Sequence, residues 1–166
     1  MNKVVLILII SAIITSTTKA QECNVRRVDD EVTGRSYGSI DKISIGEPKG
    51  GENIEIWALS NYYTNSIYFD LNSGKTCVRS DDSAYILWTD GTRVRLKNYG
   101  EFNCEGRFTF RFIDKRDFFK EITSKLIKTI RVYTDDTIVE RSPSLAIATK
   151  IRNEMTCLLK AEFKKY

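Results

Sequence analysis

Segments in which apolar and polar residues alternate fill the middle of the chain. In residues 107–113, RFTFRFI, three phenylalanines share one face while Thr109 and Arg111 share the other. A period of two is typical of a half-buried β-strand. Similar segments, separated by turns that contain Asn, Asp and Gly, predict further strands over residues 54–59, 66–71, 76–78, 84–88 and 93–97.

Beyond residue 113 the apolar residues recur at helical spacing. Residues 114–126 predict a short helix, and residues 127–134 and 137–141 predict two more strands. A second helix is expected from Ser142 towards Phe163, because the proline that follows Ser142 is well placed in a first helical turn. The apolar stripe of this helix comprises Ile147, Ile151, Met155, Leu158 and Leu159.

This order of elements predicts an α+β fold. We expect a curved antiparallel β-sheet of five to seven strands, with one short helix and a C-terminal helix packed on it. Residues 21–53 are polar and glycine-rich and end in GEPKGGEN, which is typical of an irregular segment. The predicted organisation is therefore an irregular N-terminal arm over residues 21–53 and a single α+β domain over residues 54–166.

The first twenty residues have the pattern of a secretory signal peptide. Lys3 precedes an apolar run over residues 4–14 that is too short to span a bilayer, and small residues come before Gln21. We expect cleavage near Ala20 and a periplasmic or secreted mature chain without a membrane span. A lipid anchor on Cys23 is not expected, because a glutamate precedes it where lipoprotein processing requires a small residue.

The charge of the chain changes this picture little. There are 26 basic and 22 acidic side chains, and removing residues 1–20 with their two lysines leaves 24 against 22. A net charge near +2 does not indicate a nucleic-acid partner, which normally requires a strongly basic domain.

Four cysteines in an exported chain predict disulfide bonds rather than a metal site, because the sequence has no histidine and no CxxC spacing. If Asp90 and Gly91 form a two-residue turn, the paired positions of the flanking strands add up to 181. Cys77 and Cys104 also add up to 181, so this register places them opposite each other. We therefore expect a Cys77–Cys104 disulfide.

The other two cysteines lie far apart in the sequence. Cys157 falls nearly opposite the apolar stripe of the C-terminal helix, so it is either idle or covered by another segment. The N-terminal arm with Cys23 is the available cover, and a Cys23–Cys157 bridge would stabilise the fold by ~3–5 kcal/mol through closure of a long loop. Two unpaired thiols are the alternative.

The strand predicted over residues 93–97, RVRLK, carries three cations on one face. In the register set by a two-residue turn, Ile86 and Trp88 share that face, and the guanidinium of Arg93 would stack on the Trp88 ring. The opposite, core-facing side then carries Leu87, Val94 and Leu96.

Further cations could extend this positive face across neighbouring strands, namely Arg111, and also Arg131 together with Tyr133. Because like charges placed side by side on a sheet are unfavourable, such a face predicts an anionic ligand. A solvated face neutralised by nearby carboxylates is the alternative. The candidate binding residues are Trp88, Arg93, Arg95, Lys97 and Arg111.

Catalytic chemistry is restricted by the composition. Without histidine the chain has no Ser-His-Asp or Cys-His arrangement and no histidine-ligated metal. The run GEPKGG lacks the GK[ST] ending of a phosphate-binding loop, so no catalytic residue, metal or cofactor is predicted. Residues 61–69, NYYTNSIYF, concentrate tyrosine and asparagine as carbohydrate-contacting loops do, but tyrosine-rich segments are also ordinary in small β domains. Candidate carboxylates occur as acidic pairs at residues 29–30, 81–82 and 135–136.

Several stretches between residues 76 and 159 form a recognisable set: TCV, AYILWTDGTRVRL, FNCEGRFTF, the helix before KTIRVYTDD, and MTCLL. In these stretches the chain resembles a group of small exported proteins from Bacteroidetes to which no function is assigned. The resemblance implies export and a single domain. It implies no catalytic residue, cofactor or substrate.

Together these patterns predict an exported, non-catalytic domain that binds an envelope protein or an anionic glycan. The alternative is a carboxylate-dependent hydrolase that acts on glycan or cell-wall material. A third possibility is an inhibitor or accessory subunit that works by surface contact. Two carboxylates about 5–10 Å apart in a cleft would favour the hydrolase, whereas a sheet face without such a pair would favour binding.

Overall fold

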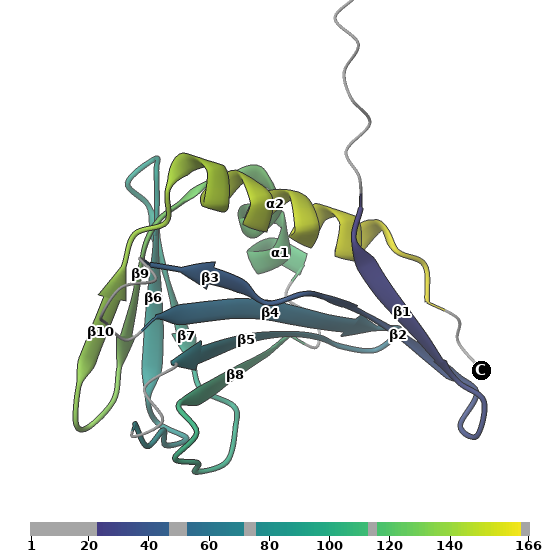
Figure 1. The fold of residues 1–166 in the computed structure, drawn as a ribbon, viewed down its shortest axis with the longest axis horizontal. Coiled ribbons are helices and arrows are strands. Elements are labelled where there is room, and N and C mark those ends of the chain that lie inside the picture. Colours follow the sequence, from purple (N-terminus) through teal and green to yellow (C-terminus); the bar gives the residue numbers. More distant parts are fainter. Residues whose placement is uncertain (1–22, 47–52, 72–75, 113–115, 164–166) are drawn as a thin grey trace, which may run out of the picture.

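The computed structural model describes residues 23–46, 53–71, 76–112 and 116–163, which form ten strands and two helices. The predicted α+β class is confirmed, but two antiparallel sheets with more strands than expected replace the single sheet of five to seven. The strands of the two sheets run crosswise, and both helices lie on one side of them (Figure 1). The predicted signal peptide lies outside the described residues.

Six strands form the first sheet: β1 Val25–Asp30, β2 Arg35–Ile40, β3 Ile43–Ile45, β4 Ile54–Asn61, β5 Asn65–Leu71 and β8 Arg107–Phe112. Their order is β1, β2, β4, β5, β8, with β3 paired to another part of β4. In β4 and β8 every second residue is buried, as the alternation predicts. The buried side of these strands faces the helices and forms much of the core.

The prediction of an irregular arm over residues 21–53 is wrong for the part that the structure describes. Most of that part forms β1, β2 and β3. The alternation of β2 is hard to see in the sequence because Ser36 and Gly38 fill two of its three buried positions. Gly38 has to be small, since a Cβ there would lie 2.7 Å from the ring of Phe163. Tertiary packing therefore selects a strand that hydrophobicity does not reveal.

Four strands form the second sheet: β6 Ser83–Trp88, β7 Arg93–Lys97, β9 Ile127–Tyr133 and β10 Ile138–Arg141. Their order is β10, β9, β6, β7, so β10 and β7 are its edges. All four occur where the sequence predicts them. The strand predicted over residues 76–78 is wrong, because Val78 makes only an isolated bridge with Asn103.

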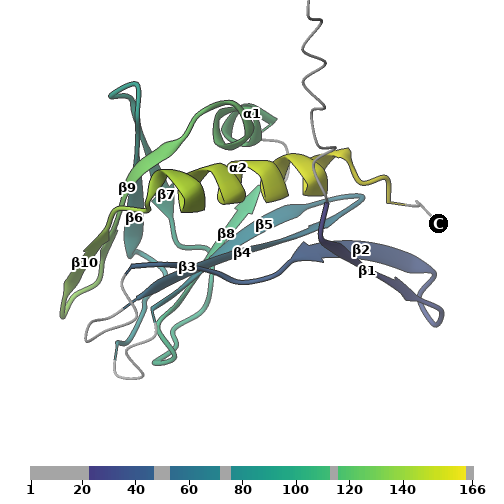
Figure 2. The ribbon, with the colours of Figure 1, turned by 45° about the horizontal axis from the view of Figure 1, so that its top comes forward.

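The two helices are α1 Arg116–Ser124 and α2 Leu145–Lys160. Ser144 caps α2, since its hydroxyl accepts a hydrogen bond from the Ile147 N–H at 3.3 Å. The predicted apolar stripe of α2 faces the core, and the helix packs against α1 and the first four strands (Figure 2). In the described part of the chain no helix is long and apolar enough to cross a membrane.

Both predicted disulfides are present. The Cα atoms are 3.8 Å apart in Cys77–Cys104 and 5.5 Å apart in Cys23–Cys157. The second bond fastens the residues before β1 to α2 and covers Cys157, which is buried. Because disulfides persist mainly in oxidising compartments, the two bonds are consistent with a periplasmic or secreted protein.

Candidate functional site

The hairpin between β6 and β7 has a three-residue loop, not the predicted two-residue turn. The Trp88 N–H donates to the Thr92 carbonyl at 2.9 Å, and Gly91 adopts a left-handed φ of 85°, which costs glycine little. The Asp90 carboxylate accepts hydrogen bonds from the Thr92 N–H at 2.9 Å and the Thr92 hydroxyl at 2.6 Å. These bonds and the nearby Lys125 lower the pKa of Asp90 to about 2.

The longer loop shifts the register of the hairpin by one residue. Ile86 now pairs with Val94 and Leu87 with Arg93, where the prediction paired Leu87 with Val94. Because side chains alternate along a strand, this shift exchanges the faces of all residues in β6 relative to β7. Trp88 is fully buried and packs near Phe118, with ring centroids 6.4 Å apart. The predicted contact between Trp88 and Arg93 is therefore wrong.

The three cations of β7, Arg93, Arg95 and Lys97, are exposed as predicted. Their neighbours on β6 differ from the prediction, however. Tyr85 and Leu87 stand on the same face as the cations, and the expected isoleucine and tryptophan point into the core. The hairpin of β6 and β7 thus places the cations beside a tyrosine ring and not beside the indole of Trp88.

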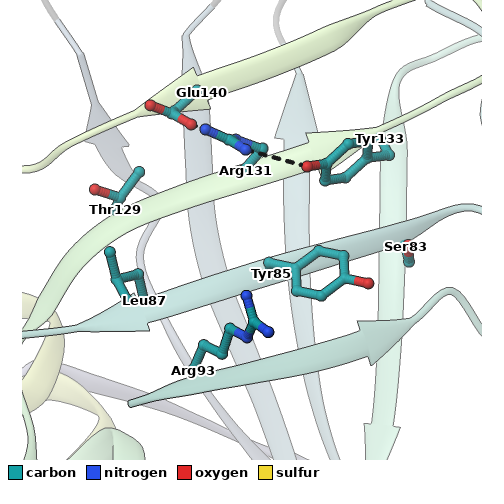
Figure 3. A pocket seen from close by; sticks show the side chains of 8 residues that line it. All are labelled: Ser83, Tyr85, Leu87, Arg93, Thr129, Arg131, Tyr133 and Glu140. Atoms are coloured by element: carbon teal, nitrogen blue, oxygen red, sulfur yellow. Dashed lines mark hydrogen bonds and ion pairs between the residues drawn. The ribbon is translucent and has the colours of Figure 1, made fainter. Parts of the chain in front are cut away.

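The outer side of the second sheet is here called the basic face. Its side chains form three rows across the strands, and most of them are drawn in Figure 3. The rows follow from the pairing of the four strands: Ile138–Tyr133–Ser83–Lys97, Glu140–Arg131–Tyr85–Arg95 and Thr129–Leu87–Arg93.

One of the four cations on the basic face is neutralised by a neighbour. Arg131 donates a hydrogen bond to the Tyr133 hydroxyl at 3.2 Å and forms an ion pair with Glu140, and both interactions raise the pKa of Arg131. Among the residues that the structure describes, the three cations of β7 form no ion pair. The Arg95 guanidinium lies 5.9 Å from the centre of the Tyr85 ring, a contact that leaves its charge uncompensated.

An open hollow of about 670 Å³ lies over the basic face. Tyr85 and Tyr133 line it with rings packed edge to face, 5.6 Å between centroids, and Arg93 and Arg131 also border it (Figure 3). The hollow is lined by one carboxylate, Glu140, which is already ion-paired. This arrangement can hold an anionic group against an aromatic surface, and it lacks the carboxylate pair that glycoside hydrolysis uses.

Arg111, which was predicted to extend the positive face, lies on the other sheet. It belongs to β8, where it pairs with Ser66 of β5. Its guanidinium lies 5.6 Å from the centre of the Tyr99 ring. The structure therefore does not place Arg111 on one sheet face with the cations of β7, whereas Arg131 does lie on the basic face.

A second group of charges, on the outer side of the first sheet, was missed by sequence reasoning. We call it the Asp70 cluster, which comprises Lys42, Glu55, Trp57, Asp70 and Arg107. Lys42 Nζ lies 2.6 Å and Arg107 Nε 2.9 Å from the Asp70 carboxylate, which also accepts the Trp57 ring N–H at 3.3 Å. Burial acts to raise the pKa of Asp70, but the two cations outweigh it and the pKa is lowered. One feature of the sequence could have indicated this cluster, because Asp70 is the single charged residue in the otherwise uncharged strand SIYFDL.

Residues 61–69, for which a sugar-contacting loop was one possibility beside an ordinary β-domain segment, form the turn between β4 and β5 and most of β5. Tyr62 and Tyr63 are 51% and 55% exposed and line a second hollow of about 200 Å³. The carboxylate that lines this hollow is Asp30, whose oxygens accept hydrogen bonds from the Thr33 backbone and hydroxyl. The second hollow therefore also lacks a pair of carboxylates.

Two of the acidic pairs meet near Arg79. Asp82 accepts the Arg79 N–H at 2.7 Å, and Asp135 forms an ion pair with the Arg79 side chain. Burial is the main cause that raises the pKa of Asp82. Across the described ranges, no group of three His, Cys, Asp or Glu side chains is placed to hold a metal ion.

Comparisons of this chain with protein-family models, with curated proteins and with solved structures found no match. The resemblance to small exported Bacteroidetes proteins therefore stays a prediction from the sequence. The functional argument depends on the geometry of the two sheets.

Proposed function

We propose that the protein is an exported, non-catalytic domain whose basic face binds an anionic partner, either an envelope protein or an anionic glycan. One observation carries the proposal: Arg93, Arg95 and Lys97 point to solvent in a row without ion-pair partners among the described residues. Alternate residues of a strand lie ~6.7 Å apart, so the row presents three positive charges over a short distance. Their mutual repulsion is relieved when an anion binds.

The surroundings of the row suit a partner that offers more than charge. The hollow beside it is lined by Tyr85, Leu87 and Tyr133. Tyrosine provides an apolar ring and a polar hydroxyl, so it can contact a sugar ring or an aliphatic side chain next to an anionic group. The basic face can therefore hold either class of anionic partner.

The hydrolase alternative has less support. Each of the two hollows is lined by one carboxylate, Glu140 or Asp30, and each of these carboxylates is already bonded to a neighbour. A glycoside hydrolase normally uses two carboxyl groups that flank the bond to be cleaved. Neither hollow provides that pair, and the carboxylates that meet near Arg79, Asp82 and Asp135, line neither of the two hollows.

The proposal is tested by measuring binding of the mature chain to polyglutamate and to polygalacturonate, a carboxylated polysaccharide, at low and physiological salt. We expect at least one polymer to bind, with affinity falling as salt screens the charges. The triple variant R93Q/R95Q/K97Q should bind at least about tenfold more weakly while folding normally, because these cations are exposed.

The matched control is R26Q/K150Q/K160Q, which removes the same charge from exposed positions on β1 and α2. It should bind as the wild-type chain does. An equal loss in both triple variants would mean that binding follows net charge and not the basic face. If the wild-type chain binds neither polymer and also fails to bind the acidic peptide described below, the proposed function is refuted.

A further inference from the structure

The free edge of β7 exposes backbone groups as well as cations. The Trp88 N–H bonds to the Thr92 carbonyl and the Asn98 N–H bonds to the Asp82 carbonyl, each at 2.9 Å. In an antiparallel ladder hydrogen-bonded pairs alternate with non-bonded pairs. The residues of β7 whose backbone bonds to β6 are therefore Val94 and Leu96. The backbone N–H and C=O groups of Arg93, Arg95 and Lys97 point away from β6.

No strand among the described residues pairs with that side of β7, which is the last strand of its sheet. The opening is limited at its end, because the Tyr99 N–H bonds to the Thr109 carbonyl of β8 at 2.7 Å. At the other end lies the loop that contains Gly91. The free edge thus spans the five residues of β7, or ~17 Å of extended chain.

The charge of this edge selects what can pair with it. A second copy of β7 would bring three cations against three cations, which is the usual way in which natural proteins prevent edge-to-edge association. A strand with carboxylates opposite the same three positions would instead form cross-strand ion pairs. Between the cations, Val94 and Leu96 face the other side of the sheet, where Val94 is partly buried and Leu96 is buried, so apolar residues fit the intervening positions of the partner.

We propose that the edge of β7 accepts an extended polypeptide segment in which acidic and apolar residues alternate, as a fifth strand of the second sheet. This inference rests on the proposed function, because it uses the same three cations, and it narrows the partner to a protein. A glycan has no regular row of amide groups to pair with the backbone of β7.

The first experiment uses the blocked peptide GEVEVEG and a scrambled peptide of the same composition, GEEVVEG, with the mature wild-type chain. Both carry the same charge, so a difference reports the alternation. We expect GEVEVEG to bind at least about tenfold more tightly. Equal affinities would overturn strand addition.

The second experiment places N-methyl groups on alternate amides of GEVEVEG, either on the glutamates or on the intervening residues. In an added strand of either direction every second amide faces β7. One methylated peptide should therefore lose at least about tenfold in affinity, and the other should bind like the parent peptide. If both bind like the parent peptide, the backbone of β7 takes no part and the inference is wrong.

A pair of protein variants tests the same edge from the other side. R95Q removes a charge and keeps the N–H, whereas R95P removes both at an edge position where proline is tolerated. We expect R95Q to weaken GEVEVEG binding about fivefold and R95P to weaken it by at least a further tenfold. Circular dichroism and thermal melting check that R95P folds, and the methylated peptides decide the question if it does not.

The two proposals fail in different ways. If polygalacturonate binds through the three cations and GEVEVEG does not, the strand-addition inference is overturned and the proposed function stands. If polyglutamate, polygalacturonate and GEVEVEG all fail to bind, both are overturned.

Discussion

Both sheets place cations and aromatic rings on their outer side. On the first sheet Lys42 and Arg107 flank Asp70, which is only 5% exposed. Both cations lie within hydrogen-bond distance of the Asp70 carboxylate and compensate its charge. On the second sheet the three cations of β7 stand in a row, and the nearby carboxylate, Glu140, pairs with Arg131. The same residue types therefore serve the fold on one sheet and remain open to a partner on the other.

The difference follows from where the acidic residue lies. A carboxylate that is removed from water needs cations and hydrogen-bond donors around it. Removing these partners would leave a buried charge without compensation, which destabilises the fold. Among the residues that the structure describes, the cations of β7 have no buried counter-ion that depends on them. Replacing these cations should consequently change the free energy of unfolding little. Their charges are therefore available to bind a partner.

The largest expected effect separates the two sides of the second sheet. Trp88→Ala should destabilise the protein by ~3–5 kcal/mol, because it leaves a cavity where a fully buried indole packs in the core. Tyr85→Ala, on the outer side of the same strand, should cost clearly less. Urea unfolding followed by circular dichroism measures both. A small effect of the Trp88 change would show that the indole is not part of the core.

The second prediction compares the acidic residues of the two outer faces. Asp70→Asn should cost about 2–4 kcal/mol, because Lys42 and Arg107 lose their shared counter-ion; the range allows for the partial exposure of both cations. Glu140→Gln breaks an exposed pair and should cost at most ~1 kcal/mol. Equal losses in urea unfolding would remove the distinction between the two faces.

The third prediction concerns acid. Because the pKa of Asp70 is lowered from its ordinary value of 3.8, its contribution to stability is complete above that value and is lost as the pH falls through the lower pKa of the folded state. Wild-type stability should therefore fall more steeply below about pH 4 than that of Asp70→Asn. Melting temperatures of both proteins between about pH 2 and pH 6 measure the difference, and parallel curves would contradict it.

The smallest expected change in stability belongs to the cations of β7. R93Q/R95Q/K97Q should alter the free energy of unfolding by at most ~1 kcal/mol, since exposed and unpaired charges contribute little. The control R26Q/K150Q/K160Q should behave alike in the same urea titration, because the ion pair that it breaks, Arg26–Asp41, is exposed. A loss of several kcal/mol in the first variant alone would reveal that the basic face is structural, as the Asp70 cluster is.

Much of the fold could be predicted because its signals are local. The alternation in β4, β8 and β9 and the helical stripe of α2 need only neighbouring residues to be read. The two disulfides were also predicted, but one of them for an incomplete reason. Cys77 and Cys104 are joined although the register that suggested their pairing is wrong along the whole pairing of β6 with β7.

The remaining errors come from contacts between distant residues. Whether the hairpin loop has two or three residues depends on Gly91, Asp90 and Thr92, and also on the burial of Trp88 in a core that α1 helps to build. The alternation of β2 is hidden by Gly38, a buried position that packs closely against Phe163. Neither contact leaves a periodic pattern in the local sequence.

The sequence by itself determined that Arg93, Arg95 and Lys97 point to one side, because a period of two is a property of the strand alone. Only the tertiary structure decided that Tyr85 and not Trp88 stands beside them, that Arg111 belongs to another sheet, and that Asp70 is surrounded by cations. Those outcomes depend on the register and on which strands become neighbours, and both are chosen by burial and hydrogen bonding over the whole chain.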